Sequence, residues 1–161
     1  LVGSEMCIRD RLGSPWGYLV VGVLTPIAEE IVFRGAILRT LRKSFQQTTP
    51  WIPIALSALI FGLAHGNFAQ FPHAFLMGLL LGWMYVRTNS IIPGVVFHWI
   101  NNSSVFILYN VMPQTANLRL VEIFGGSQRA VWLSLLFSLC IFLPSLFQLQ
   151  RRLHPAEEKL K

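Results

Sequence analysis

Residues 44–86 read SFQQTTPWIPIALSALIFGLAHGNFAQFPHAFLMGLLLGWMYV and contain no Asp, Glu, Lys or Arg. A second uncharged stretch, AVWLSLLFSLCIFLPSLFQLQ, covers residues 130–150. About 20 apolar residues are enough for a helix to cross the hydrocarbon core of a bilayer. A helix is also the form that pairs its own backbone groups where no water is present. These two stretches therefore predict an all-α fold whose helices lie in a membrane.

The composition of the whole chain supports this prediction. Only 12% of its 161 residues are charged, 53% are hydrophobic, and the chain contains 12 Phe and 5 Trp. Soluble domains have about a quarter of their residues charged. The net charge of +6 does not indicate nucleic acid, because the basic residues lie between apolar stretches and not along one face. We therefore expect the lipid bilayer as a partner and no nucleic acid.

Working outward from the uncharged stretches, we expect a multi-pass transmembrane bundle of about five helices, over residues 16–41, 52–66, 71–87, 92–111 and 130–150. Residues 12–150 would then form the membrane domain, and residues 151–161, RRLHPAEEKLK, a charged cytoplasmic tail. Residues 1–11, LVGSEMCIRDR, fit no span and resemble a translated sequencing adapter, so we expect a non-native leader there. We also expect that N-terminal helices of the natural protein are missing.

The basic residues predict the orientation in the membrane, since cytoplasmic loops carry an excess of Lys and Arg. If helix 16–41 ends in the cytoplasm, most of the basic residues that flank the helices fall on that side, and only Arg119 and Arg129 fall on the other. The cytoplasmic set is Arg39, Arg42, Lys43, Arg87, Arg151, Arg152, Lys159 and Lys161. We therefore expect a cell-membrane protein with a cytoplasmic C-terminus.

Three charged residues, Glu29, Glu30 and Arg34, lie inside the first expected helix, in EEIVFRG. Charged side chains within a membrane span are costly and indicate a functional site. Glu30 and Arg34 have i,i+4 spacing, so they share a helix face and can form an ion pair. Glu29 is turned by about 100° from Glu30 and is free to face another helix. A purely structural cluster of all three is the alternative, although one carboxylate would suffice to pair Arg34.

Two further helices carry residue pairs with the same i,i+4 spacing: Phe61 and His65 in FGLAH, and His98 and Asn102 in HWINN. A single His on an apolar helix is usually a packing residue, but bundle cores build sites from side chains on facing helices. A carboxylate in such a site can act as a general base. Glu29 with His65 could therefore polarise a water molecule for attack on a peptide carbonyl. His98 and Asn102 offer N–H donors to the oxyanion that this attack creates.

The same residue types leave a metal-dependent reaction open. Glu29, His65 and His98 could hold a divalent metal such as zinc, which imidazole nitrogen and carboxylate oxygen both suit. The sequence lacks the HExxH motif of zincin proteases, and spacing alone does not decide between metal-bound and carboxylate-activated water. By rise along their helices, His65 lies about 20 Å and His98 about 10 Å from the cytoplasmic ends. A shared site therefore requires that the helices tilt or that their ends lie a few residues from the expected positions.

The motifs EEIVFRG, FGLAH and HWINN, in this order, closely resemble those of the CPBP family. This is the CAAX-protease and bacteriocin-processing group of intramembrane proteases, also called Abi, with the patterns EExxxR, FxxxH and HxxxN or HxxxD. The resemblance covers residues 15–111 and, more loosely, the last helix. It implies an endopeptidase whose site residues are Glu29 and His65 for the water, His98 and Asn102 for the oxyanion, and Glu30, Arg34 and Phe61 in support.

The resemblance also implies a protein or peptide substrate. Eukaryotic relatives remove the last three residues of prenylated CAAX proteins, and the family is described both as metalloproteases and as glutamate-dependent proteases without metal.

Two other function classes stay open. A catalytically silent scaffold or immunity protein would keep its activity after Glu29→Ala. A transporter subunit that relays protons through the Glu and His residues would show broken helices and internal repeats, and the sequence contains no repeat.

Overall fold

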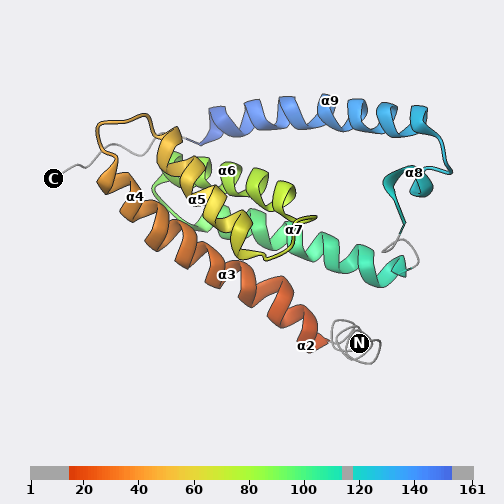
Figure 1. Ribbon diagram of the computed structural model, residues 1–161, viewed down its shortest axis with the longest axis horizontal. Coiled ribbons are helices and arrows are strands. Elements are labelled where there is room, and N and C mark those ends of the chain that lie inside the picture. The colour runs from red at the N-terminus through yellow and green to blue at the C-terminus, as the bar shows by residue number, and fades with distance from the viewer. Residues whose placement is uncertain (1–14, 114–117, 154–161) are drawn as a thin grey trace. The chain divides into compact units, whose positions relative to one another are not determined.

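Figure 1 shows the computed structural model of the chain, in which residues 15–113 and 118–153 are described and all long elements are helices. The first helix is a continuous run made of α2 (Pro15–Gly17), η1 (Tyr18–Leu24), α3 (Thr25–Glu30), η2 (Ile31–Leu38) and α4 (Arg39–Ser44). It is followed by α5 (Trp51–Ala64), α6 (Phe71–Thr88), α7 (Ile92–Val111), α8 (Leu120–Ile123) and α9 (Gln128–Arg152). Within these ranges the all-α prediction is confirmed, and the five long helices match the expected ones to within a few residues.

Two of the expected segments fall wholly or largely outside this description. The expected leader, residues 1–11, lies outside the described residues, and so do residues 154–161 of the expected tail. Between the last two long helices lies the short helix α8, which is not among the helices expected from the sequence. This short helix begins where Glu122 accepts a hydrogen bond of 2.7 Å from the backbone N–H of Arg119. Such a carboxylate at the third helical position stabilises a helix start.

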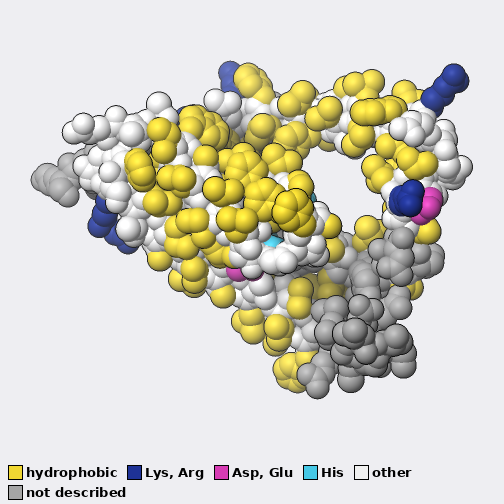
Figure 2. All heavy atoms as spheres, in the orientation of Figure 1, with side chains coloured by type: hydrophobic (Ala, Val, Ile, Leu, Met, Phe, Trp, Pro, Cys, Tyr) yellow, Lys and Arg dark blue, Asp and Glu magenta, His cyan; other side chains and the backbone are white. Residues whose placement is uncertain are grey.

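The described residues form two compact units, residues 15–104 and residues 105–113 with 118–153. In the second unit, α9 is the helix that is long and apolar enough to cross a membrane, by length and composition. Two further helices are apolar but shorter: Trp51–Ala64 in the first unit, and Ile92–Leu108, which begins in the first unit. Figure 2 shows hydrophobic side chains over much of the visible surface. Trp132, Leu133 and Phe137 of α9 are each about two-thirds exposed. An all-α membrane bundle accounts for such a surface.

Glycines bring α5 and α6 into close contact in the first unit. A Cβ atom added at Gly78 would lie 2.8 Å from Ala58 Cα, and one at Gly82 would lie 3.0 Å from Ile54 Cγ2. Gly78 and Gly82 are therefore positions at which the two helices approach each other closely. The buried side chains of Leu38, Ile54 and Tyr85 pack next to this contact. This packing brings α6 against the first helix at the level of the charged residues.

The first helix is π-helical on both sides of its acidic pair, in η1 and η2. The backbone N–H of Thr25 bonds to Val20 O, five residues back, and the Thr25 hydroxyl donates to the same carbonyl at 2.9 Å. Pro26 follows, and proline has no N–H to continue the helical pattern. Single π-helical turns of this kind are frequent at functional sites. In the sequence, Pro26 is the local feature that indicates this departure from α-helical hydrogen bonding.

Candidate active site

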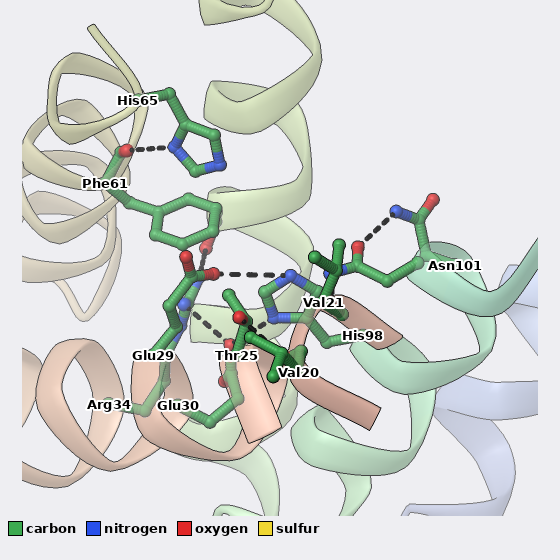
Figure 3. A network of polar contacts seen from close by, with 12 residues as sticks. Val20, Val21, Thr25, Glu29, Glu30, Arg34, Phe61, His65, His98 and Asn101 are labelled. Carbon is green, nitrogen blue, oxygen red and sulfur yellow. Dashed lines mark hydrogen bonds and ion pairs between the residues drawn. The ribbon is translucent and has the colours of Figure 1, made fainter. Parts of the chain in front are cut away.

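Charged and polar side chains from three parts of the first unit point toward one another, as Figure 3 shows. The first helix contributes Glu29, Glu30 and Arg34, α5 contributes Phe61, and α7 contributes His98. His65 is the residue that follows the last turn of α5. The structure therefore brings together the three motifs that the sequence singles out.

The centre of the cluster is a buried ion pair. Arg34 Nη1 donates to Glu30 Oε1 at 2.8 Å, and the two side chains are 1% and 0% exposed. Arg34 Nη2 donates to the carbonyl oxygen of Gly78 at 3.2 Å. The Arg34 guanidinium also lies 4.6 Å above the ring of Phe61, a favourable cation–π distance. The predicted pairing of Glu30 with Arg34 is thus confirmed, and the bond from Arg34 to Gly78 ties α6 to the first helix.

His98 lies between the two glutamates. Its Nδ1 is 3.1 Å from Glu30 Oε1, and its Nε2 is 3.5 Å from Glu29 Oε2. Because a carboxylate oxygen accepts, Nδ1 is the hydrogen-bond donor to Glu30. If the ring is neutral, Nε2 carries a lone pair. Nε2 and the Glu29 carboxylate then attract each other only when a further proton lies on one of them. Glu29 and His98 therefore form a pair that can hold one mobile proton.

The two glutamates differ in their access to other molecules. The side chain of Glu30 is 0% exposed, whereas that of Glu29 is 27% exposed. Glu30 Oε1 already accepts from Arg34 and His98. Glu29, by contrast, makes no other ion pair or hydrogen bond within the described residues than the longer one to His98. Of the two carboxylates, Glu29 is the one that a water molecule or a substrate can reach.

His65 reaches the cluster through Phe61. Its Nδ1 lies 2.9 Å from Phe61 O, and because a carbonyl only accepts, Nδ1 must be the donor. The Phe61 ring packs edge to face with both His65 and His98, with centroids 4.8 and 5.8 Å apart. In the described part of the chain no hydrogen bond or ion pair joins His65 to Glu29, the partner expected for it. The neutral ring of His65 would present the lone pair of Nε2 as an acceptor.

The amide of Asn102, one helical turn after His98, bonds to the first helix. Asn102 Nδ2 donates to Val21 O at 3.3 Å, and Asn102 Oδ1 accepts from Asn101 Nδ2 at 3.2 Å. Within the described residues this amide makes no hydrogen bond with His98. Asn102 therefore flanks the cluster at the level of η1.

The residues considered for a metal do not assemble into a ligand set in this arrangement. The described residues contain no group of three His, Cys, Asp or Glu side chains that could hold a metal ion. Each ring nitrogen of His98 faces a carboxylate, and Arg34 already supplies the positive charge next to Glu30. The Phe61 ring lies between His65 and His98 in Figure 3. The set Glu29, His65 and His98 thus does not fit a three-ligand zinc centre here.

Two features of the site were not found by sequence reasoning. Tyr18 OH lies 3.0 Å from Ser103 Oγ and accepts a hydrogen bond of 3.1 Å from Trp99 Nε1, so η1 is attached to α7 beside the cluster. The second is Gly94, at which an added Cβ would lie 2.8 Å from Glu30 Oε2. Its position four residues before His98 on α7 is the signal that could have identified it.

We expect Gly94→Ala to lower both stability and activity. A methyl group at this position must push against the buried carboxylate of Glu30, and such overpacking costs about 1–3 kcal/mol. The matched control is Gly35→Ala, because a Cβ at Gly35 meets nothing closer than 3.9 Å. Unfolding of purified variants in detergent, followed by helical signal, measures the difference. Equal stability of the two variants would show that α7 does not approach Glu30 closely.

Comparison with known proteins agrees with this cluster. Residues 11–104 match the model of the family described as type II CAAX prenyl endopeptidase Rce1-like. The chain is 31% identical over 97 residues to "Membrane-embedded CAAX protease MroQ" of Staphylococcus aureus, an alignment that covers 58% of this chain and 39% of that protein. It is 29% identical over 94 residues to "Putative membrane peptidase YdiL" of Bacillus subtilis, covering 58% and 37%. No solved structure matches.

The chain spans about two-fifths of the length of these curated relatives. The matched region ends at the last residue of the first compact unit. It therefore includes every residue of the cluster, from Glu29 to Asn102. The chain belongs to the Rce1-like family of type II CAAX prenyl endopeptidases.

Proposed function

We propose that this chain carries the catalytic centre of an intramembrane endopeptidase in which Glu29 is the general base. The observation that carries the proposal is the unequal access of the two glutamates: Glu29 is 27% exposed and Glu30 is 0% exposed. A general base must reach its water, and it must hand the proton on. Glu29 meets the first need because its side chain is 27% exposed, and in the proposed reaction it hands the proton on to the leaving nitrogen of the peptide.

In the proposed reaction Glu29 takes a proton from water while the water oxygen bonds to the carbonyl carbon of the peptide. His65 supports this step as an acceptor for the other water proton, since its Nδ1 is committed to Phe61 O. The electron pair of the carbonyl double bond moves to the oxygen, which becomes an oxyanion. The C–N bond then breaks, and the proton held by Glu29 passes to the nitrogen. The products are a carboxylic acid and an amine.

His98 and Asn102 are the proposed donors to the oxyanion. A protonated His98 Nε2 lies at the open edge of the pair with Glu29, and its contact of 3.5 Å is long enough for a substrate oxygen to compete for the proton. Donors placed in advance in a dry site are worth about 10²–10³ in kcat each. Glu30, Arg34 and Phe61 hold the His98 ring in this orientation.

The proposed substrate is a protein or peptide that enters the site from the bilayer. The name of the Staphylococcus aureus relative includes the words "CAAX protease". That name describes the relative, and for this chain the proposed substrate is a polypeptide. Zinc is not part of the proposed reaction, because the described donors do not form a ligand set.

The test is cleavage of a mixed pool of peptides and membrane proteins by the purified full-length protein. It is compared with Glu29→Gln, in each case with and without a chelator. We expect cleavage by the natural protein, loss of cleavage in Glu29→Gln, and no effect of the chelator. Chelator-sensitive cleavage would overturn the metal-free mechanism. Equal cleavage by both proteins would remove Glu29 from the reaction, and no cleavage by either, with helical content intact, would favour a scaffold or a proton relay.

We further propose a multi-pass arrangement in the cell membrane with the C-terminus in the cytoplasm. Arg39, Arg42 and Lys43 of α4, and Arg151 and Arg152 at the end of α9, would then lie on the cytoplasmic side. Fusion of a fluorescent protein that matures only in the cytoplasm to the C-terminus of the full-length protein should give fluorescent cells. Activity of a periplasmic reporter at the same position would reverse the proposed orientation.

A further inference from the structure

A proline in the first helix leaves one carbonyl oxygen without its main-chain donor. The N–H of Thr25 bonds to Val20 O, which is an i to i−5 bond. In that pattern the next donor would be the N–H of residue 26, and its acceptor would be Val21 O. Residue 26 is a proline, which has no N–H, and its side chain is almost fully buried. Val21 O is therefore free to bond outside its own helix.

The donor that takes this place comes from α7. Asn102 Nδ2 donates to Val21 O at 3.3 Å, and Figure 3 shows Val21 and Asn101 beside the cluster. A carbonyl freed by proline inside a membrane is costly unless a neighbouring helix supplies a donor. The bond from Asn102 supplies one. It also fixes which end of the Asn102 amide faces the first helix, because Val21 O can only accept.

The same reasoning gives the hydrogen-bond partners of the other polar atoms of the Asn102 amide. With Nδ2 toward Val21, Oδ1 is the atom that faces Asn101, and it accepts from Asn101 Nδ2 at 3.2 Å. An Asn amide has two N–H donors, and only one of them is used on Val21. Within the described part of the chain the second N–H has no acceptor. The amide is thus held at two points and keeps one donor for another molecule.

We infer that Pro26 is a positioning residue for the reaction, together with Asn101. By withholding an N–H from Val21 O, Pro26 makes that carbonyl available to orient Asn102, so that one amide N–H is left for the oxyanion. This inference rests on the proposed function, because the oxyanion exists only if the chain hydrolyses peptide bonds. The hydrogen-bond arrangement itself does not depend on catalysis, and it can be tested separately.

The first test compares the kinetics of Pro26→Ala, Asn102→Ala and the double variant in the full-length protein. Alanine at residue 26 supplies the missing N–H to Val21 O and releases the Asn102 amide. We expect kcat to fall about 10- to 100-fold in Pro26→Ala, the cost of misplacing a catalytic group, with KM unchanged. The double variant should have the same kcat as Asn102→Ala alone, because both changes act through one amide.

The matched control is Pro144→Ala, which adds a backbone donor inside α9, a helix that supplies none of the cluster residues. Its kcat should equal that of the natural protein. A Pro26→Ala variant with unchanged kcat would overturn the inference. So would a double variant whose kcat falls by the product of the two single effects, because independent changes multiply.

The second test measures the thermal unfolding midpoint and needs no activity. Asn102→Ala should lower the midpoint clearly in the natural background and much less in the Pro26→Ala background, where Val21 O already has a main-chain donor. An equal decrease in both backgrounds would overturn the hydrogen-bond arrangement. If the natural protein cleaves nothing while the two decreases differ, the arrangement stands and the proposed function is what fails.

Discussion

Replacing Arg34 with methionine is expected to lower the free energy of unfolding by about 3–5 kcal/mol, the usual cost of removing one partner of a buried ion pair. Methionine keeps most of the length and apolar bulk of the side chain, so the loss comes from the charge. Without Arg34, the fully buried carboxylate of Glu30 would keep only His98 as a partner. The carbonyl of Gly78 would also lose the donor that ties α6 to the first helix.

The control is Arg39→Met, because Arg39 lies on the same helix and is exposed. Changes at exposed positions stay within about 0.5 kcal/mol. The measurement is denaturant unfolding in detergent, followed by helical signal. The double variant Glu30→Gln with Arg34→Met should recover part of the lost free energy of unfolding, because it also removes the unpaired charge of Glu30. Equal stability of Arg34→Met and Arg39→Met would contradict the buried ion pair.

Replacing Glu29 with glutamine is expected to lower kcat by about 10²–10⁴, the range attributed to a general base. Glutamine has nearly the size and shape of glutamate, but its amide cannot take a proton from water. Because the side chain is partly exposed and its one polar partner in the described part of the chain is His98, we expect the free energy of unfolding to change by less than about 0.5 kcal/mol. A large loss of activity with an intact fold is the signature of this role.

The control for Glu29→Gln is Glu122→Gln, which removes a carboxylate from α8 and leaves the cluster intact. Steady-state kinetics on one cleaved substrate, together with thermal unfolding of all three proteins, makes the comparison. Glu122→Gln should retain the natural kcat. If Glu29→Gln lost stability as well as activity, Glu29 would be a structural partner of His98 and not the base.

Contacts within one helix could be predicted from the sequence, because 3.6 residues per turn fix them. The pairs Glu30 with Arg34 and Phe61 with His65 are of this kind, and both are present. The turn of about 100° between the two glutamates also indicated that Glu29 would face another helix. The long helices followed from the apolar stretches of the sequence, although the first of them also carries Glu29, Glu30 and Arg34.

Contacts between helices could not be predicted, because they depend on how closely the backbones approach. The sequence alone suggested His65 as the partner of Glu29, and the structure places His98 there. This outcome depends on Gly94, which allows α7 to approach Glu30, and on the Phe61 ring, which His65 and His98 both contact. The bond from Asn102 to Val21 O likewise depends on a π-helical turn that periodicity does not reveal.

The central claim is that Glu29 activates a water molecule that attacks the peptide bond directly. The most direct test is a single turnover of a cleaved substrate in ¹⁸O-labelled water, with mass spectrometry of the new carboxyl terminus. The account predicts one ¹⁸O atom in the product of the natural protein and no product from Glu29→Gln in the same time. Product from Glu29→Gln at the natural rate, or first-turnover product without ¹⁸O, would contradict it.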